Sequence, residues 1–124
     1  MKAALSNFYK TKRKFDTYKT VLIIGDMLEL GQNAKEMHLE LIPMIKKINP
    51  DVLITIGAYS KKISDKLDVQ MNCNSFLTMP PLIEKITQFI KPNQLILIKG
   101  SNGTGLWKLI PIFKNLNQEK RDVA

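Results

Sequence analysis

The sequence is poor in the residues that mark disulfide, metal and membrane proteins. It has one cysteine, Cys73, and one histidine, His38. A lone cysteine cannot form an intrachain disulfide, which fits a reducing compartment, so a cytoplasmic location is expected. With no second cysteine and no histidine nearby, Cys73 predicts neither a zinc site nor a thiol nucleophile. No metal site is expected within the chain.

Long hydrophobic runs are also lacking. Apolar runs such as 21–24 and 95–98 hold only a handful of residues, whereas a membrane-spanning helix needs about 20. The N-terminus lacks the apolar stretch of a signal peptide. Membrane insertion is therefore not expected. The 124 residues, 44% of them hydrophobic, predict a single domain rather than a disordered chain.

Acidic residues are outnumbered. Nineteen Lys and Arg against eleven Asp and Glu give a formal net charge of +8. This balance favours polyanionic partners, and one interpretation is a non-enzymatic α/β module that binds an anionic polymer. The densest basic stretch comprises Lys10, Lys12, Arg13, Lys14 and Lys19. The other interpretation is solvated lysines on helix faces. No aromatic platform or helix-turn-helix accompanies the cations, so nucleic acid is not expected as a partner.

Three apolar runs predict buried strands. They span residues 21–24, 52–56 and 95–98, and each ends in or just before a glycine. Unbroken apolar runs are typical of strands covered on both faces, as in a parallel sheet. Residues 75–78 predict a short edge strand. Between the runs, apolar residues recur at helical spacing over 34–45, 58–67, 82–90 and 106–113.

The order of these elements predicts an α/β fold, an open, mostly parallel Rossmann-like sheet with helices on both faces. Residues 1–15 also show helical spacing, yet no strand precedes them, so the sheet is expected to lack its first strand. Pro43 predicts a kink or break in the 34–45 helix. The domain is expected to cover 1–116, with a polar, frayed tail over 117–124.

Two loops at strand ends are candidate sites, because open α/β sheets bind ligands at the carboxyl ends of their strands. The first, 25–31, places Asp26 and Glu29 between glycines. These carboxylates suit an ammonium group, a ribose hydroxyl or a metal ion. Alternatively, Asp26 caps a turn and Glu29 is solvated. His38 follows on the apolar side of a predicted helix, where a packing role is the alternative to a functional one.

The second loop, 99–105, contains Lys99, Gly100, Ser101 and Asn102 directly before a predicted helix. Backbone amides and a helix N-terminus can converge on an anion or carboxylate there. The alternative is a flexible turn of small residues. The loop is not a phosphate-binding Walker motif, because Leu106 and Trp107 follow where lysine and serine or threonine are required.

These motifs together resemble the C-terminal domain of the Mur ligases. The resemblance rests on V-L-I-I-G-D-M-L-E-L-G at 21–31 followed by His38, D-V-L-I-T-I-G at 51–57 and L-I-L-I-K-G-S at 95–101. It covers residue 1 to about 116. Within the family, the pattern is similar to the enzymes that add D-alanyl-D-alanine to UDP-N-acetylmuramoyl-tripeptide. Many relatives carry arginine after K-G-S, where this chain has Asn102.

The resemblance implies an ATP-dependent ligase of peptidoglycan synthesis, with ATP and magnesium used by the full-length enzymes. It implies that Lys99, Gly100, Ser101 and Asn102 lie by the dipeptide, with Asp26, Glu29 and His38 near the face that closes. The N-terminal and central domains would hold the UDP-sugar and most of the ATP contacts. The 124 residues alone are therefore expected to be catalytically inactive, to hold no cofactor tightly and to bind D-Ala-D-Ala weakly.

Overall fold

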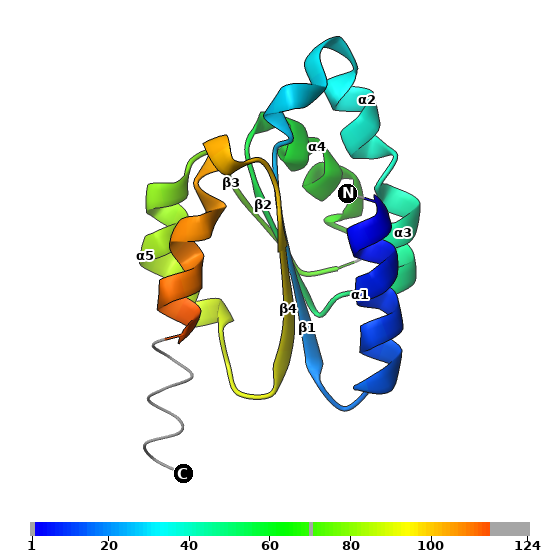
Figure 1. The fold of residues 1–124 in the computed structure, drawn as a ribbon, viewed down its shortest axis with the longest axis vertical. Helices are drawn as coiled ribbons and strands as arrows, with labels where there is room; N and C mark the ends of the chain where they lie inside the picture. Colours follow the sequence, from blue (N-terminus) through cyan, green and yellow to red (C-terminus); the bar gives the residue numbers. More distant parts are fainter. Residues whose placement is uncertain (1, 70, 115–124) are drawn as a thin grey trace.

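A computed structural model describes residues 2–69 and 71–114, apart from the side chains of Glu29, Leu30 and Asn102. These residues form a four-stranded, all-parallel sheet between two layers of helices (Figure 1). The strands are β1 (Lys19–Gly25), β2 (Val52–Ile56), β3 (Cys73–Phe76) and β4 (Gln94–Lys99). Their order across the sheet is β3-β2-β1-β4. The expected α/β class is confirmed, and no strand precedes the first helix in the described residues.

The helices divide between the two faces of the sheet. The α-helices are α1 (Lys2–Lys14), α2 (Ala34–Leu39), α3 (Ile42–Ile48), α4 (Ala58–Leu67) and α5 (Met79–Phe89). Three short 3-10 helices are η1 (Leu28–Asn33), η2 (Asn102–Thr104) and η3 (Leu106–Lys108), and 109–114 continue as α-helix. Figure 1 shows α1, α3 and α4 on one face, with α5 and the segment 106–114 on the other.

Each face of the sheet has its own apolar core. Alternate residues of a strand point to opposite faces. Leu22 and Ile24 of β1 therefore pack with α1, α3 and α4. Val21 and Ile23 pack with α5 and the C-terminal segment. All four side chains are fully buried, which is why the run reads as unbroken apolar sequence.

The chain reverses its direction across the sheet between β1 and β4. After β1 the chain crosses to β2 and β3 through helices on one face, and from β3 it returns through α5 on the other face to β4. Neighbouring strands whose connections leave to opposite faces define a topological switch point. In open α/β sheets, ligands bind outside the carboxyl ends of the strands at such a point.

Most of the predicted elements are present. The strand predicted at 52–56 matches β2, and the other two buried strands extend by one or two residues at each end. The edge strand is Cys73–Phe76 rather than 75–78, because its pairing with β2 begins at Leu53 opposite Cys73. The predicted break near Pro43 is confirmed, since α2 ends at Leu39 and Pro43 lies in the first turn of α3. The polar tail predicted at 117–124 lies outside the described residues.

Candidate functional site

The carboxyl ends of β1 and β4 touch each other at the switch point. A Cβ atom added to Gly100 would lie 3.0 Å from the Cα atom of Gly25 and 2.7 Å from a methyl carbon of Leu106. A Cβ added to Gly25 would meet the same methyl carbon at 2.7 Å. Gly100 therefore leaves room for the backbone of Gly25, and a methyl group added at either glycine would displace the buried Leu106 side chain that lies over the junction.

Ser101 joins the two candidate loops. Its backbone amide donates to the carbonyl of Asp26 at 3.2 Å. Its hydroxyl oxygen accepts a hydrogen bond from the amide of Leu28 at 2.8 Å. The loops 25–31 and 99–105, predicted separately as sites, thus form one structural unit.

The glycine-rich loop 99–105 is folded on itself rather than open. The amide and the hydroxyl of Thr104 both donate to the carbonyl of Ser101, at 3.0 and 2.6 Å. Gly105 adopts φ 79° before η3 begins. The amides of Ser101 and Thr104 are therefore already bonded to carbonyl oxygens, so an anion at this loop would depend on other donors.

Asp26 anchors the start of α4. The residue is 6% exposed, and its carboxylate accepts hydrogen bonds from the amides of Ser60 at 2.7 Å and Tyr59 at 3.2 Å. An acidic side chain at a helix N-terminus satisfies amides that lack a partner within the helix and complements the helix dipole. The sequence left open whether Asp26 binds a ligand or caps a turn, and the geometry shows a capping role. The capped element is the N-terminus of α4, which follows β2, whereas Asp26 itself follows β1.

Gly57 makes room for this cap. It has φ 108°, and a Cβ atom there would lie 2.3 Å from the Asp26 carboxyl carbon. Sequence reasoning noted Gly57 only as the end of a strand and did not single it out as part of the site. A sequence signal is present, because a glycine stands between the strand and the helix that follows it. The group that needs the space, the Asp26 carboxylate, comes from the loop directly after β1.

His38 holds the first loop against α2. Its Nε2 accepts a hydrogen bond from the amide of Met27 at 3.0 Å, and its Nδ1 lies 2.5 Å from the carbonyl oxygen of Ala34. Because an amide can only donate and a carbonyl can only accept, the neutral ring carries its proton on Nδ1. The ring is 1% exposed and stacks on Tyr59 with a centroid distance of 5.4 Å. His38 thus has the packing role that the sequence analysis gave as one alternative: it is buried, hydrogen-bonded on both ring nitrogens and stacked on Tyr59.

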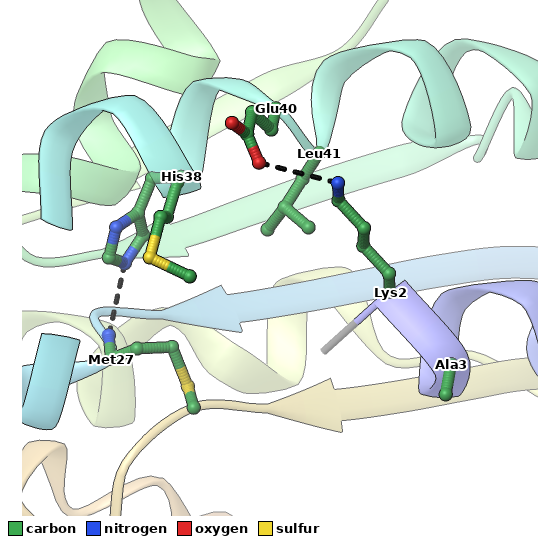
Figure 2. Close-up of a pocket in the computed structure, with 7 residues that line it drawn as sticks. Lys2, Ala3, Met27, His38, Glu40 and Leu41 are labelled. Carbon is green, nitrogen blue, oxygen red and sulfur yellow. Dashed lines mark hydrogen bonds and ion pairs between the residues drawn. The ribbon is translucent and has the colours of Figure 1, made fainter. Parts of the chain in front are cut away.

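A pocket of about 340 Å³ opens beside His38 (Figure 2). Its lining is mostly apolar, from Met27, Met37 and Leu41, with Lys2 and Glu40 also contributing. Lys2 and Glu40 form an ion pair of 3.3 Å between well-exposed side chains, a type of pair that adds little stability. The start of α1 therefore lies at the same end of the sheet as the two candidate loops.

A second, smaller pocket of about 170 Å³ lies beside the end of β4. Lys99, Gly100 and Ser101 line it together with apolar residues of the following segment, including Trp107 and Ile110. Trp107 is 58% exposed, and the Lys108 ammonium lies 5.7 Å from the centre of its ring. Three of the four predicted dipeptide residues thus line one cavity that also offers apolar surface. Sequence reasoning did not include Trp107 in the site.

The remaining predicted residues are only partly described. Glu29 lies in η1 and Asn102 in η2, but their side chains are outside the described part of the chain. Within residues 2–69 and 71–114, no group of three or more His, Cys, Asp or Glu side chains is placed to hold a metal ion. No helix of the described residues is long and apolar enough to cross a membrane.

Two residues of the basic stretch 10–19, Lys12 and Arg13, make contacts within the fold. The Lys12 ammonium donates to the carbonyls of Ile48 and Asn49 at the C-terminus of α3. Cations are stabilising at helix C-termini because carbonyls without partners gather there. Arg13 and Lys47 both lie over the Tyr9 ring, at 6.0 and 4.8 Å from its centre.

Residues 1–102 match the family described as Mur ligase, glutamate ligase domain. The chain belongs to this family. It is 39% identical over 92 residues to the UDP-N-acetylmuramoyl-tripeptide–D-alanyl-D-alanine ligase of Rickettsia prowazekii, a match covering 74% of this chain and 20% of that enzyme. It is 26% identical over 97 residues to the Borreliella burgdorferi ligase of the same name, covering 77% of this chain and 21% of that enzyme. The chain thus matches about a fifth of the length of these relatives.

Proposed function

We propose that this chain is the dipeptide-positioning domain of an ATP-dependent ligase that joins D-Ala-D-Ala to UDP-N-acetylmuramoyl-tripeptide. Two curated relatives carry that activity in their names, and the family match covers residues 1–102. The observation that carries the proposal is the joined pair of loops at the β1–β4 switch point. There, Ser101 ties the K-G-S segment to the G-D-M segment.

The dipeptide would lie against Lys99, Gly100, Ser101 and Asn102. D-Ala-D-Ala combines a carboxylate with two methyl groups, so it needs a cation beside apolar surface. The small pocket at the end of β4 is lined by Lys99, Trp107 and Ile110. Lys99 pairs with Ile24 and leaves the strand on the α1 face, so its ammonium would reach the dipeptide carboxylate over the end of the strand. A lysine ammonium acts as a strong charged donor to a carboxylate. The Asp26 cap, Glu29 and His38 would shape the neighbouring face that closes on the other domains.

In the proposed reaction, the terminal carboxylate of the tripeptide takes the γ-phosphoryl group of ATP and ADP leaves. The amino group of the dipeptide then attacks the acyl carbon, the C–N bond forms, phosphate departs and the amine loses a proton. ATP and magnesium would be held by the central domain and the UDP-sugar by the N-terminal domain. The contribution of this chain is to orient the amine and exclude water from an intermediate that water would hydrolyse.

Isolated from those domains, the chain is proposed to bind D-Ala-D-Ala and ATP weakly and to be inactive. A chimera tests the proposal. The C-terminal part of the Rickettsia prowazekii ligase that aligns with this chain is replaced by this chain, and phosphate release is measured with tripeptide, ATP and dipeptide. Activity that requires D-Ala-D-Ala supports the proposal. A folded chimera that binds ATP and the UDP-tripeptide but releases no phosphate on addition of dipeptide would overturn it.

A further inference from the structure

The end of the molecule opposite the candidate site carries a cluster of basic side chains. α1 leads into β1 and α3 leads into β2, so both helices end where strands begin (Figure 1). Neither helix contains an acidic residue. The cluster, called here the basic patch, comes from the second half of α1, the last turn of α3 and the first residue of β1. Its members are Lys10, Lys12, Arg13, Lys14, Lys19, Lys46 and Lys47.

Contacts between the two helices make these cations one surface. The Lys12 ammonium of α1 donates to carbonyls at the C-terminus of α3, so the last turns of the helices lie together. Arg13 from α1 and Lys47 from α3 both approach the ring of Tyr9. The basic patch is therefore shared by two elements that are separated in the sequence and packed side by side.

The charge of the basic patch is not neutralised by ion pairs. Lys10, Arg13 and Lys14 are exposed, and their spacing of three and four residues puts them on one face of α1. Among the described residues, no ion pair includes a cation of the patch. Two carboxylates are close in the chain, Asp16 and Asp51, and that of Asp51 already accepts a hydrogen bond from a backbone amide. The patch therefore attracts an anionic partner.

Two exposed aromatic side chains adjoin the basic patch. Phe15 and Tyr18 follow α1 directly and are 46% and 39% exposed. Their ring centres lie 5.7 Å apart with an angle of 31° between the rings, so they form one apolar projection beside the cations. Aromatic rings are enriched where a protein meets the headgroups of a bilayer, and Lys and Arg beside them reach the lipid phosphates.

The same rings are poorly suited to nucleic acid. Single-stranded nucleic acid binds where bases can stack on open aromatic faces. The Tyr9 ring has cations over it, and Phe15 and Tyr18 pack against each other. In the part of the chain that the structure describes, the aromatic residues of this end thus favour a lipid surface over stacked bases.

We propose that the basic patch, together with Phe15 and Tyr18, is a docking surface for an anionic lipid bilayer. The cations lie against lipid phosphates, and the two rings enter the headgroup region. Each Lys or Arg held near an anionic surface adds to the attraction. The two candidate loops lie at the carboxyl ends of the strands, so a docked chain keeps them turned away from the lipid. The proposal rests on this surface and not on the proposed ligation.

Co-sedimentation of the full chain with vesicles tests the proposal. One set of vesicles contains equal parts of phosphatidylglycerol and phosphatidylcholine, and the other contains phosphatidylcholine alone. The patch variant carries Lys10→Gln, Arg13→Gln and Lys14→Gln. A matched control removes the same charge from exposed lysines of α2 and α4, away from the patch. Its substitutions are Lys35→Gln, Lys61→Gln and Lys62→Gln. Thermal unfolding of each variant confirms that it is folded.

We expect the parent chain to bind the anionic vesicles and not those of phosphatidylcholine alone. The patch variant should lose affinity roughly tenfold or more, and the control less than about threefold. Equal losses in the two variants would overturn the proposal, because they would show attraction by net charge alone. Equal binding to both kinds of vesicle would overturn it too.

A second variant tests the aromatic pair. Phe15→Ser combined with Tyr18→Ser should weaken binding to the anionic vesicles while leaving its salt dependence unchanged, because apolar contacts are lost and no charge is removed. Unchanged affinity would contradict the docking of the rings in the headgroup region. Tighter binding of the parent chain to polyuridylic acid than to anionic vesicles, at equal phosphate concentration, would overturn the proposal and assign the patch to nucleic acid.

Discussion

Asp26 at the end of β1 accepts a hydrogen bond of 2.7 Å from the amide of Ser60 in the first turn of α4. This contact links the end of β1, where the first candidate loop begins, to α4, the helix that connects β2 to β3. The neighbouring carbonyl of Asp26 is bonded to Ser101. The candidate site is therefore built on side chains and backbone groups that hold strand ends together.

Replacing Asp26 with alanine should lower the free energy of unfolding by about 1–2 kcal/mol, because the amides of Ser60 and Tyr59 lose their acceptor in a buried position. Urea denaturation measures this loss. Asp65→Ala is the matched control on the same helix, since Asp65 makes only an exposed ion pair with Lys61, worth about 0.3–0.5 kcal/mol. Equal losses in the two variants would contradict the capping role.

Gly57→Ala should destabilise the fold by more than the backbone conformation alone requires. The new methyl group would lie 2.3 Å from the Asp26 carboxyl carbon, in addition to the strain of φ 108°. Gly31→Ala is the control, because Gly31 has φ 64° but no atom within 4 Å of the added Cβ, which leaves only the backbone strain, about 1–3 kcal/mol.

A double-mutant cycle separates the two causes. If the contact with Asp26 dominates, Asp26→Ala should recover part of the stability lost in Gly57→Ala, so the two losses are not additive. Strictly additive losses would show that the close approach to Asp26 has no energetic consequence.

His38→Phe should retain the stack on Tyr59 but remove the acceptor for the Met27 amide. The expected loss is about 1–3 kcal/mol, the cost of leaving buried polar groups without partners. Faster hydrogen exchange at the Met27 amide should accompany it. In the parent chain, nitrogen chemical shifts should place the ring proton on Nδ1. A proton found on Nε2 would contradict the hydrogen-bond assignment.

The thiol of Cys73 should react slowly with iodoacetamide near neutral pH. Burial raises the pKa of Cys73 above its ordinary value, and the Asp68 charge adds to the rise, while a hydrogen bond with Ser64 opposes it. A higher pKa leaves less thiolate, the reactive form, at a given pH. Alkylation should therefore be slower in the folded chain than in urea. Asp68→Asn should speed it and Ser64→Ala should slow it; the reverse order would contradict these causes.

The sequence was sufficient for the elements whose burial is complete. β2 matches its prediction because both faces of the run 52–56 are covered and a glycine follows it. β3 was displaced by two residues because the apolar Leu77 suggested a strand, yet Leu77 is 64% exposed and the strand is defined by its pairing with β2. A short edge strand has little burial of its own to mark it.

The candidate site was predictable in its parts but not in its connections. Glycines and carboxylates at strand ends identified the loops of Asp26 and Ser101. That Ser101 would accept from Leu28, or that Gly57 would make room for Asp26, depends on which strand ends lie side by side. Trp107 joins the site because the chain turns back past β4, which local sequence does not show.

The most direct measurement is the Michaelis constant of the chimeric ligase for each substrate, with and without Lys99→Gln. If Lys99 receives the dipeptide carboxylate, the variant should raise the KM for D-Ala-D-Ala by roughly tenfold or more, the loss of a charge-assisted hydrogen bond. The KM values for ATP and the UDP-tripeptide should stay unchanged. A rise confined to ATP or to the UDP-tripeptide, or an unchanged KM for D-Ala-D-Ala, would contradict the proposed role of this domain.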